Sequence, residues 1–204
     1  KKGNEIWLFT RRLENVTKQF PDVVEMAKKC LKAKECIVEG ECVAIDPKTG
    51  ERLPFQRLSQ RIQRKYEIER MVREIPTQVN LFDVVYLDGE MLFDKTQEER
   101  RKILESIVDV VPGKFQLTEA IVTKDLKEAE EFYKKALEAK QEGVMVKNPN
   151  ATYMFGRHVG GWWKVKPIME TLDLVIIGAE WGTGKRANWL GTVSCTHLPL
   201  PTKA

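Results

Sequence analysis

The sequence predicts a mixed α and β fold (α+β), and two observations carry this prediction. Apolar runs with the two-residue period of strands alternate with runs at helical spacing from Ile6 to Lys147, which disfavours a helix bundle or a β-sandwich. The 204 residues are 42% hydrophobic and 31% charged, which excludes low-complexity and wholly disordered classes. The length accommodates one domain and part of a second.

The first elements follow from local patterns. The segment Glu5–Thr10 is predicted to be a strand, and a helix is expected to begin near Pro21, because Pro21 and Asp22 suit a first turn and apolar residues recur behind them at helical spacing. A strand follows over Cys36–Ile45 and ends in a turn rich in Pro, Lys and Gly.

Three helices and a strand make up the middle of the chain. A helix with a basic face that includes Arg61 is expected over Ser59–Ile75, and an apolar strand over Gln78–Leu87. Thr96, with Glu99 three residues later, forms the capping box of a helix that runs to Val108. A further amphipathic helix is predicted over Asp125–Ala139.

The pattern changes after this helix. Short strands are expected over Gly143–Lys147 and Trp162–Lys166, a domain boundary near Pro167–Thr171, and a long apolar strand over Leu172–Glu180. The last ten residues, 195–204, contain two prolines without alternation and are predicted to be a tail rather than a strand.

Charge and cysteine content restrict the function classes. The net charge of +4 is too small to establish a nucleic-acid partner by itself. The four cysteines form no C-x-x-C pair and have no histidines at metal-ligand spacing. We interpret them as small buried residues with free thiols, which is typical of a protein in a reducing, intracellular compartment. No apolar run approaches the roughly 20 residues that a membrane span needs.

Two acidic residues interrupt predicted strands. Glu41 shares a strand phase with Val43 and Ile45, so it either faces an enclosed ligand, such as a metal ion or a ribose hydroxyl, or lies at an edge and faces water. Glu142 precedes Gly143, which either permits close approach of a ligand to the backbone or caps a helix.

Lysines and aromatic residues supply the remaining candidates. Lys164 and Lys166 are two residues apart and are therefore expected on one strand face, where they either hold a phosphate or face solvent. Phe82 either stacks on a nucleobase or belongs to the core, and Arg11 either pairs with a phosphate or covers a loop.

Taken in order, five segments closely resemble the ATP-dependent DNA ligases, in particular the archaeal type. The segments match nucleotidyltransferase motifs Ia, III, IIIa, IV and V, and they are Thr10–Thr17, Glu39–Ala44, Leu81–Gly89, Glu142–Lys147 and Trp163–Lys166. The resemblance implies a ligase-type, ATP-grasp-like adenylation domain of antiparallel sheets flanked by helices over residues 1–168. It implies the first strands of an OB-fold over residues 169–204.

The resemblance also implies roles for individual residues. ATP would be the AMP donor, Mg²⁺ the metal and nicked double-stranded DNA the partner, in a cytoplasmic protein of archaeal type without membrane association. Metal-bound carboxylates and paired lysines would stabilise the charge that develops at an attacked phosphorus. The implied roles are nucleotide contact by Arg11, ribose and metal contact by Glu41, adenine stacking by Phe82, metal binding by Glu142, and catalytic contact with the α-phosphate by Lys164 and Lys166.

The sequence departs from the family in two respects, and one assignment stays open. No K-x-D-G motif, whose lysine forms the covalent lysyl-AMP, occurs in the 204 residues, and the family's C-terminal motif is also absent. The basic residue expected before motif V is either Arg157 or His158. We therefore expect this chain alone not to adenylate itself. An RNA ligase, an mRNA-capping guanylyltransferase and a non-catalytic nucleic-acid-binding module remain alternatives.

Overall fold

The computed structural model describes residues 1–156, 161–168 and 174–197. The chain divides into two compact units, Lys1–Val165 and Lys166–Ala204, each of which is described by itself. No helix in the described part of the chain is long and apolar enough to cross a membrane.

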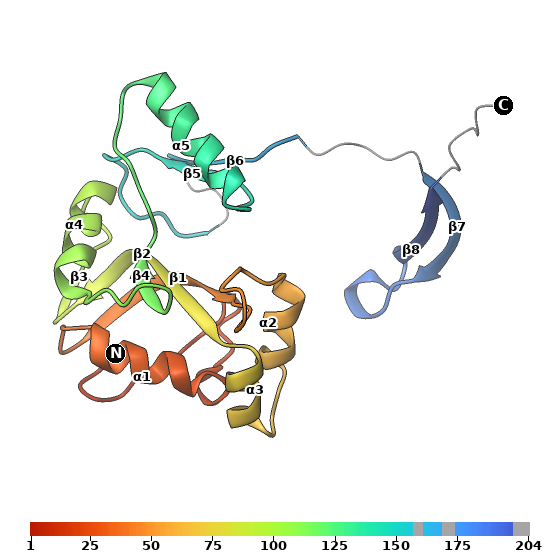
Figure 1. Ribbon diagram of the computed structural model, residues 1–204, viewed down its shortest axis with the longest axis horizontal. Coiled ribbons are helices and arrows are strands. Elements are labelled where there is room, and N and C mark those ends of the chain that lie inside the picture. Colours follow the sequence, from red (N-terminus) through yellow and green to blue (C-terminus); the bar gives the residue numbers. More distant parts are fainter. Residues whose placement is uncertain (157–160, 169–173, 198–204) are drawn as a thin grey trace. The chain divides into compact units, whose positions relative to one another are not determined.

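A four-stranded sheet organises the first unit (Figure 1). β1 (Cys36–Ala44) pairs antiparallel with β2 (Thr77–Leu87), which also pairs antiparallel with the short β3 (Glu90–Met91). β4 (Phe115–Leu117) joins β2 in parallel, so this sheet is not purely antiparallel. A separate antiparallel pair consists of β5 (Val144–Lys147) and β6 (Trp162–Val165).

Helices flank these strands. α1 begins with a proline at its first position, as predicted, and α4 begins with the capping box in which Thr96 and Glu99 bond each other's backbone N–H groups. Asp125 caps α5. The helices of the first unit are η1 (Thr17–Gln19), α1 (Pro21–Cys30), α2 (Phe55–Ile62), α3 (Ile68–Glu74), α4 (Gln97–Ile107) and α5 (Leu126–Glu138).

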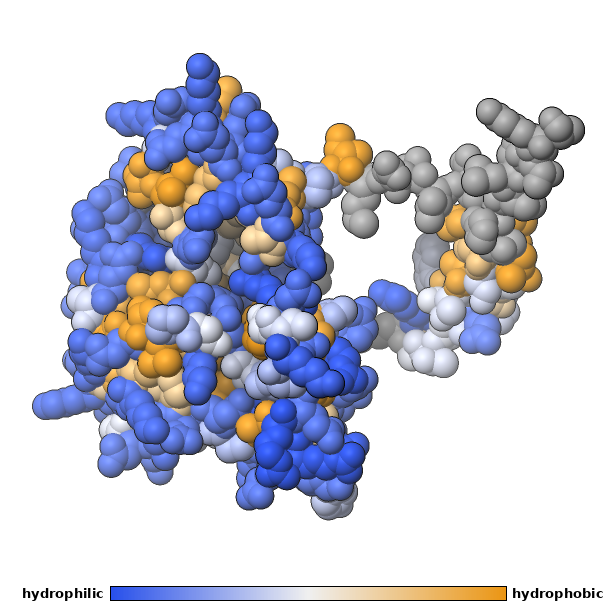
Figure 2. All heavy atoms as spheres, viewed as in Figure 1, coloured by the Kyte–Doolittle hydropathy of each residue, from blue (hydrophilic) through white to orange (hydrophobic). Residues whose placement is uncertain are grey.

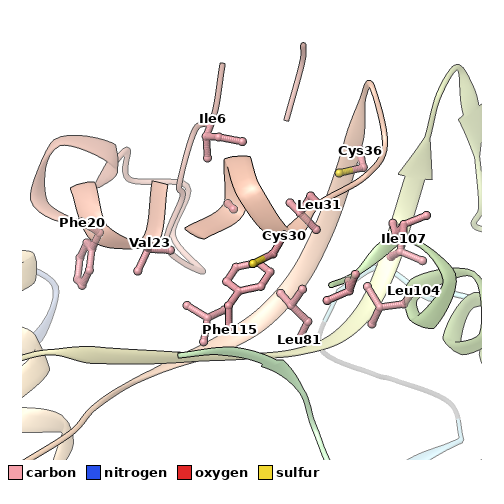
Figure 3. Packing of buried hydrophobic residues seen from close by; sticks show 14 of the residues in the cluster. Ile6, Phe20, Val23, Cys30, Leu31, Cys36, Leu81, Leu104, Ile107 and Phe115 are labelled. Atoms are coloured by element: carbon pink, nitrogen blue, oxygen red, sulfur yellow. The ribbon is translucent and has the colours of Figure 1, made fainter. Parts of the chain in front are cut away.

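The core lies between α1, α4 and the four-stranded sheet. Phe115 of β4 lies close beside Cys30 of α1, and Leu104 of α4 packs toward Leu81 of β2 (Figure 3). These side chains are all nearly inaccessible to solvent. Burial of this apolar surface is the main force that holds α1 and α4 against the sheet.

Two predicted elements near the start of the first unit differ from the structure. Glu5–Thr10 forms no strand, because in the described residues this segment makes only isolated bridges, such as that between Phe9 and Asn15. The helix predicted over Ser59–Ile75 is two helices, α2 and α3, separated by a break that ends at Glu67 with a left-handed backbone (φ 54°). The sequence does not indicate this break, because the residues just before Glu67 include no glycine or proline and are compatible with a helix.

One residue of the basic face predicted for that helix, Arg61, does not lie at the surface. Arg61 is fully buried, and its guanidinium donates to the Asp22 carboxylate of α1 and to the backbone oxygens of Gln19 and Ile75. A buried arginine requires such partners, and Asp22 lies 39 residues away in the sequence. Sequence periodicity therefore could not identify the pair.

The second unit contains one antiparallel strand pair. β7 (Leu174–Trp181) pairs with β8 (Leu190–His197), and the short η2 (Gly184–Arg186) lies between them. The tail predicted from residue 195 is therefore wrong up to His197, because pairing with β7 extends β8 that far. All eight residues of β7 are exposed. Residues 198–204 lie outside the described part of the chain.

Figure 2 shows that hydrophilic side chains cover most of the visible face of the first unit. Apolar groups appear there as separate patches rather than as one continuous surface. This distribution is ordinary for a protein surface. Apolar character therefore does not identify a functional site, which has to be found from individual residues.

Candidate functional site

Phe82 occupies a bulge in β2. The pairing of β1 with β2 passes from Glu39 opposite Asp83 directly to Gly40 opposite Leu81, so Phe82 has no partner residue in the ladder. A bulge bends the strand and re-aims a side chain, and bulges are frequent beside functional sites. The Phe82 side chain remains half-buried rather than entering the core.

Gly40 makes room for this bulge. A Cβ atom at Gly40 would lie 2.8 Å from Leu81 Cδ2 and 2.9 Å from the backbone oxygen of Asn80. Side chains do not normally approach a backbone oxygen so closely, so the two strands can come together here only because Gly40 has none.

The ammonium group of Lys147 lies over two aromatic rings. Lys147 Nζ is 5.1 Å from the centre of the Phe82 ring and 3.9 Å from the centre of the Trp162 ring. Burial lowers the pKa of Lys147 to about 8, while the negative charge of Asp83 opposes this change. Cation–π contacts compensate part of the lost hydration of the ammonium.

Lys164 lies on the same sheet face as Lys147. Lys147 pairs with Trp162 across β5 and β6, and Met145 pairs with Lys164. Because residues two apart share a face, Lys147, Trp162 and Lys164 project to one side of this strand pair. Lys164 is exposed. The predicted strand includes Lys166, but β6 ends at Val165, so Lys166 lies outside it. Lys166 is the first residue of the second unit.

The candidate carboxylates differ in environment. Glu41 is exposed, which agrees with the alternative in which it faces water. Glu39, two residues earlier in β1, is half-buried and accepts a hydrogen bond of 2.6 Å from the Tyr153 hydroxyl. Glu142 is exposed immediately before β5. Among the described residues, no three His, Cys, Asp or Glu side chains form a group able to hold a metal ion.

The predicted basic residues outside the strands are not brought into this cluster. Arg11 is exposed in the turn that the bridge between Phe9 and Asn15 closes. Arg157 and His158 lie outside the described residues.

A buried ion pair that the sequence did not indicate begins at Asp83, the residue after Phe82. Asp83 and Arg100 are both fully buried and form a two-point ion pair, in which Arg100 Nε donates to Oδ1 at 2.8 Å and Nη2 to Oδ2 at 3.0 Å. The Tyr153 ring lies 5.5 Å from this guanidinium. Burial and the bond to Glu39 raise the pKa of the Tyr153 phenol. Asp83 interrupts an otherwise apolar run, which is the one sequence feature that could have indicated it.

This arrangement places the aromatic ring of Phe82, in the middle of β2, against the Lys147 ammonium of the β5–β6 strand pair. A flat heterocycle can stack on the Phe82 ring, and an anion can lie against lysine ammonium groups. The fold and the site therefore define a candidate nucleotide-binding domain of the nucleotidyltransferase class.

Comparison with known proteins identifies the family. Residues 1–166 match the family described as ATP dependent DNA ligase domain, so the chain belongs to this family. It is 51% identical to the DNA ligase of Nanoarchaeum equitans over 99% of the chain and 36% of that protein. It is 50% identical to the DNA ligase of Thermococcus onnurineus over 94% of the chain and 34% of that protein. The chain thus spans about a third of the length of these relatives.

A solved structure of mycobacterial DNA ligase D, complexed with ATP and MES, has a similar fold. The TM-score is 0.59 at 22% identity, covering 95% of this chain and 56% of that one. The α+β ligase fold that the sequence predicts is therefore confirmed.

Proposed function

We propose that this chain is the nucleotide-binding part of an ATP-dependent DNA ligase, which takes AMP from ATP and transfers it to the 5′-phosphate of nicked DNA. The observation that carries this proposal is the position of Phe82. Phe82 lies in a bulge of β2 without a partner residue, and its ring lies beneath the ammonium group of Lys147. Lys147 belongs to the strand pair β5–β6, which also carries Lys164. An aromatic surface next to ammonium groups fits a base and its phosphates.

The site residues have distinct roles in this proposal. Phe82 stacks on adenine, and Lys164 and Lys166 hold the α-phosphate, where positive charge stabilises the negative charge that develops during attack at phosphorus. Glu41 contacts the ribose. Arg11 and one of Arg157 and His158 contact the phosphates.

Glu41 and Glu142 are the proposed ligands of Mg²⁺. Both are exposed carboxylates, and Mg²⁺ prefers such oxygen ligands. Two carboxylates suffice, because Mg²⁺ usually retains water molecules and is completed by the phosphates of its nucleotide. When bound, the ion would neutralise charge on the phosphates.

The complete reaction seals a nick in three steps. A lysine nitrogen attacks the α-phosphorus of ATP and pyrophosphate leaves, the 5′-phosphate oxygen of the nick then takes AMP from that lysine, and the 3′-hydroxyl finally displaces AMP to form the phosphodiester. The K-x-D-G lysine for the first step is not among the 204 residues. The function proposed for this chain by itself is therefore nucleotide binding. Its proposed location is the cytoplasm.

Calorimetry with ATP tests the proposal. We expect ATP to bind this chain, and Phe82→Ala to weaken binding by about 1–3 kcal/mol, the usual value of one base stacked on an aromatic ring. The matched control is Phe9→Ala, which removes an exposed phenyl ring outside the site. Lys164→Ala should also weaken binding, whereas Lys134→Ala on the exposed side of α5 should not. Equal affinities for ATP in all these proteins would contradict the assignment.

GTP separates the ligase from a capping enzyme. A capping guanylyltransferase is expected to prefer GTP, and an ATP-dependent ligase ATP. A preference of this chain for GTP would favour the capping alternative.

The basic residues of α2 and α3 favour a second candidate, a non-catalytic nucleic-acid-binding module. Arg57, Arg64 and Arg70 line a shallow pocket on this part of the surface. Arg64 and Arg70 are paired with Glu67, which reduces the positive charge there. Salt-dependent binding to a nicked duplex without any affinity for ATP would support this candidate instead of the ligase.

A further inference from the structure

Hydrogen bonds to β2, to α4 and to the loop before α4 hold the Asp83–Arg100 pair. Besides its two bonds to Asp83, Arg100 donates to the Lys95 backbone oxygen at 2.6 Å and to Gln97 Oε1 at 3.1 Å. Asp83 Oδ1 also accepts the backbone N–H of Val84 at 2.8 Å. The pair thus joins β2 to α4 and to the loop before it, with four of the five guanidinium N–H groups in use.

Stability alone does not account for such a pair. Removing two charges from water costs about as much as their attraction returns, and apolar residues of similar volume often stabilise a protein equally well. A buried pair with fixed geometry does, however, define the position of the backbone that carries it. The role of the pair therefore depends on the residues that adjoin Asp83 in β2 and in the ladder.

Asp83 connects the pair to the site on two sides. It follows Phe82 directly, so it anchors one end of the bulge, and it lies opposite Glu39 in the ladder. Above the guanidinium lies the Tyr153 ring, whose hydroxyl donates to Glu39. The backbone N–H of Tyr153 donates to the Phe93 oxygen at 2.9 Å, which fixes the loop that carries Tyr153. Phe82, Glu39 and this loop are consequently linked through Arg100.

We propose that Arg100 is a positioning residue, which, through Asp83 and through the bond of Tyr153 to Glu39, fixes β1 and β2 around the bulge and so holds the Phe82 ring in the geometry that binds the nucleotide. The inference rests on the proposed nucleotide-binding function. Arg100 itself is fully buried and acts through its neighbours. Changing it should therefore alter nucleotide affinity and the local order of β2 beyond any general loss of stability.

The chain provides a matched control in its second buried arginine. Arg61 is also fully buried and also forms a two-point pair with an aspartate, Asp22. This pair lies by Thr77, the first residue of β2, away from Asp83 in the middle of that strand, and it holds α1 against α2. Arg61→Lys and Arg100→Lys remove the same fork of donors while keeping a positive charge.

Two measurements on the 204-residue chain test the proposal. Both lysine variants should lose stability to urea, but only Arg100→Lys should raise the Kd for ATP, by about tenfold, or about 1.4 kcal/mol. Hydrogen exchange of the Phe82 and Asp83 amides should be at least about tenfold faster in Arg100→Lys than in Arg61→Lys when urea brings both to equal stability.

A milder variant covers the case in which Arg100→Lys fails to fold. Tyr153→Phe keeps the ring over Arg100 and removes only the hydroxyl bound to Glu39, and it should raise the Kd for ATP severalfold. Tyr66→Phe removes an exposed hydroxyl and should leave the Kd unchanged.

The outcomes separate this proposal from the proposed function. If the unchanged chain binds ATP and Phe82→Ala weakens binding, but Arg100→Lys and Tyr153→Phe bind as tightly as the unchanged chain, the positioning role is refuted and nucleotide binding stands. If the unchanged chain binds no ATP, the proposed function fails, and the exchange comparison still decides whether Arg100 orders the bulge. Equal exchange in Arg100→Lys and Arg61→Lys would overturn the proposal.

Discussion

Replacement of Lys147 by methionine should change how the stability of this protein depends on pH. Burial lowers the pKa of Lys147 from 10.5 to about 8. Between these two values the unfolded chain binds a proton that the folded protein has already released, so the unfolding free energy rises with pH in this window. Below about pH 8 both states carry the proton, and the folded state bears the full cost of the desolvated ammonium.

The size of the effect follows from the two pKa values. Integration from about pH 7 to pH 9.5 gives a gain of about 2 kcal/mol in unfolding free energy from Lys147 alone. Lys147→Met fills a similar volume without a charge and should lack this gain. The half-buried Cys42 thiol, whose pKa is raised to about 11, contributes a loss of stability as pH increases above 9, so the difference between the two proteins is the relevant quantity.

Urea unfolding at several pH values from 7 to 9.5 measures this difference. Lys134→Met, at an exposed position of α5, serves as the control and should follow the unchanged protein. Parallel pH profiles for Lys147→Met and the unchanged protein would refute the argument, because they would mean that the Lys147 ammonium is as well solvated in the folded state as in the unfolded chain.

Three further predictions concern separate parts of the chain. Gly40→Ala should destabilise the protein by about 1–3 kcal/mol in urea, since the new methyl group meets the Asn80 backbone oxygen, and an unchanged midpoint would show that the strands can separate at no cost. Thr96→Ala should cost about 1 kcal/mol through loss of the α4 cap, whereas Thr96→Ser should retain it. Incubation with labelled ATP and Mg²⁺ should leave no covalent AMP on this chain, because it contains no K-x-D-G lysine, and a stable labelled product would contradict this expectation.

The sequence by itself determined the elements whose causes are local. The proline of α1 and the capping box of α4 satisfy backbone groups within a few residues, so the starts of these helices could be identified without knowledge of any distant contact. The same is true of the apolar alternation of β2. The five ordered segments indicated the family, which residues 1–166 confirm.

Only the tertiary structure decided where the polar residues of these elements lie. The bulge that contains Phe82 depends on a close approach of β1 and β2 at Gly40. Glu41 is exposed, whereas Glu39 accepts a hydrogen bond from Tyr153, 114 residues away. Arg100, which the sequence presents as one of several charges on a surface helix, is fully buried because Asp83 lies opposite it. Periodicity records which side of an element is apolar, whereas the partner of a buried charge is set by packing between distant segments.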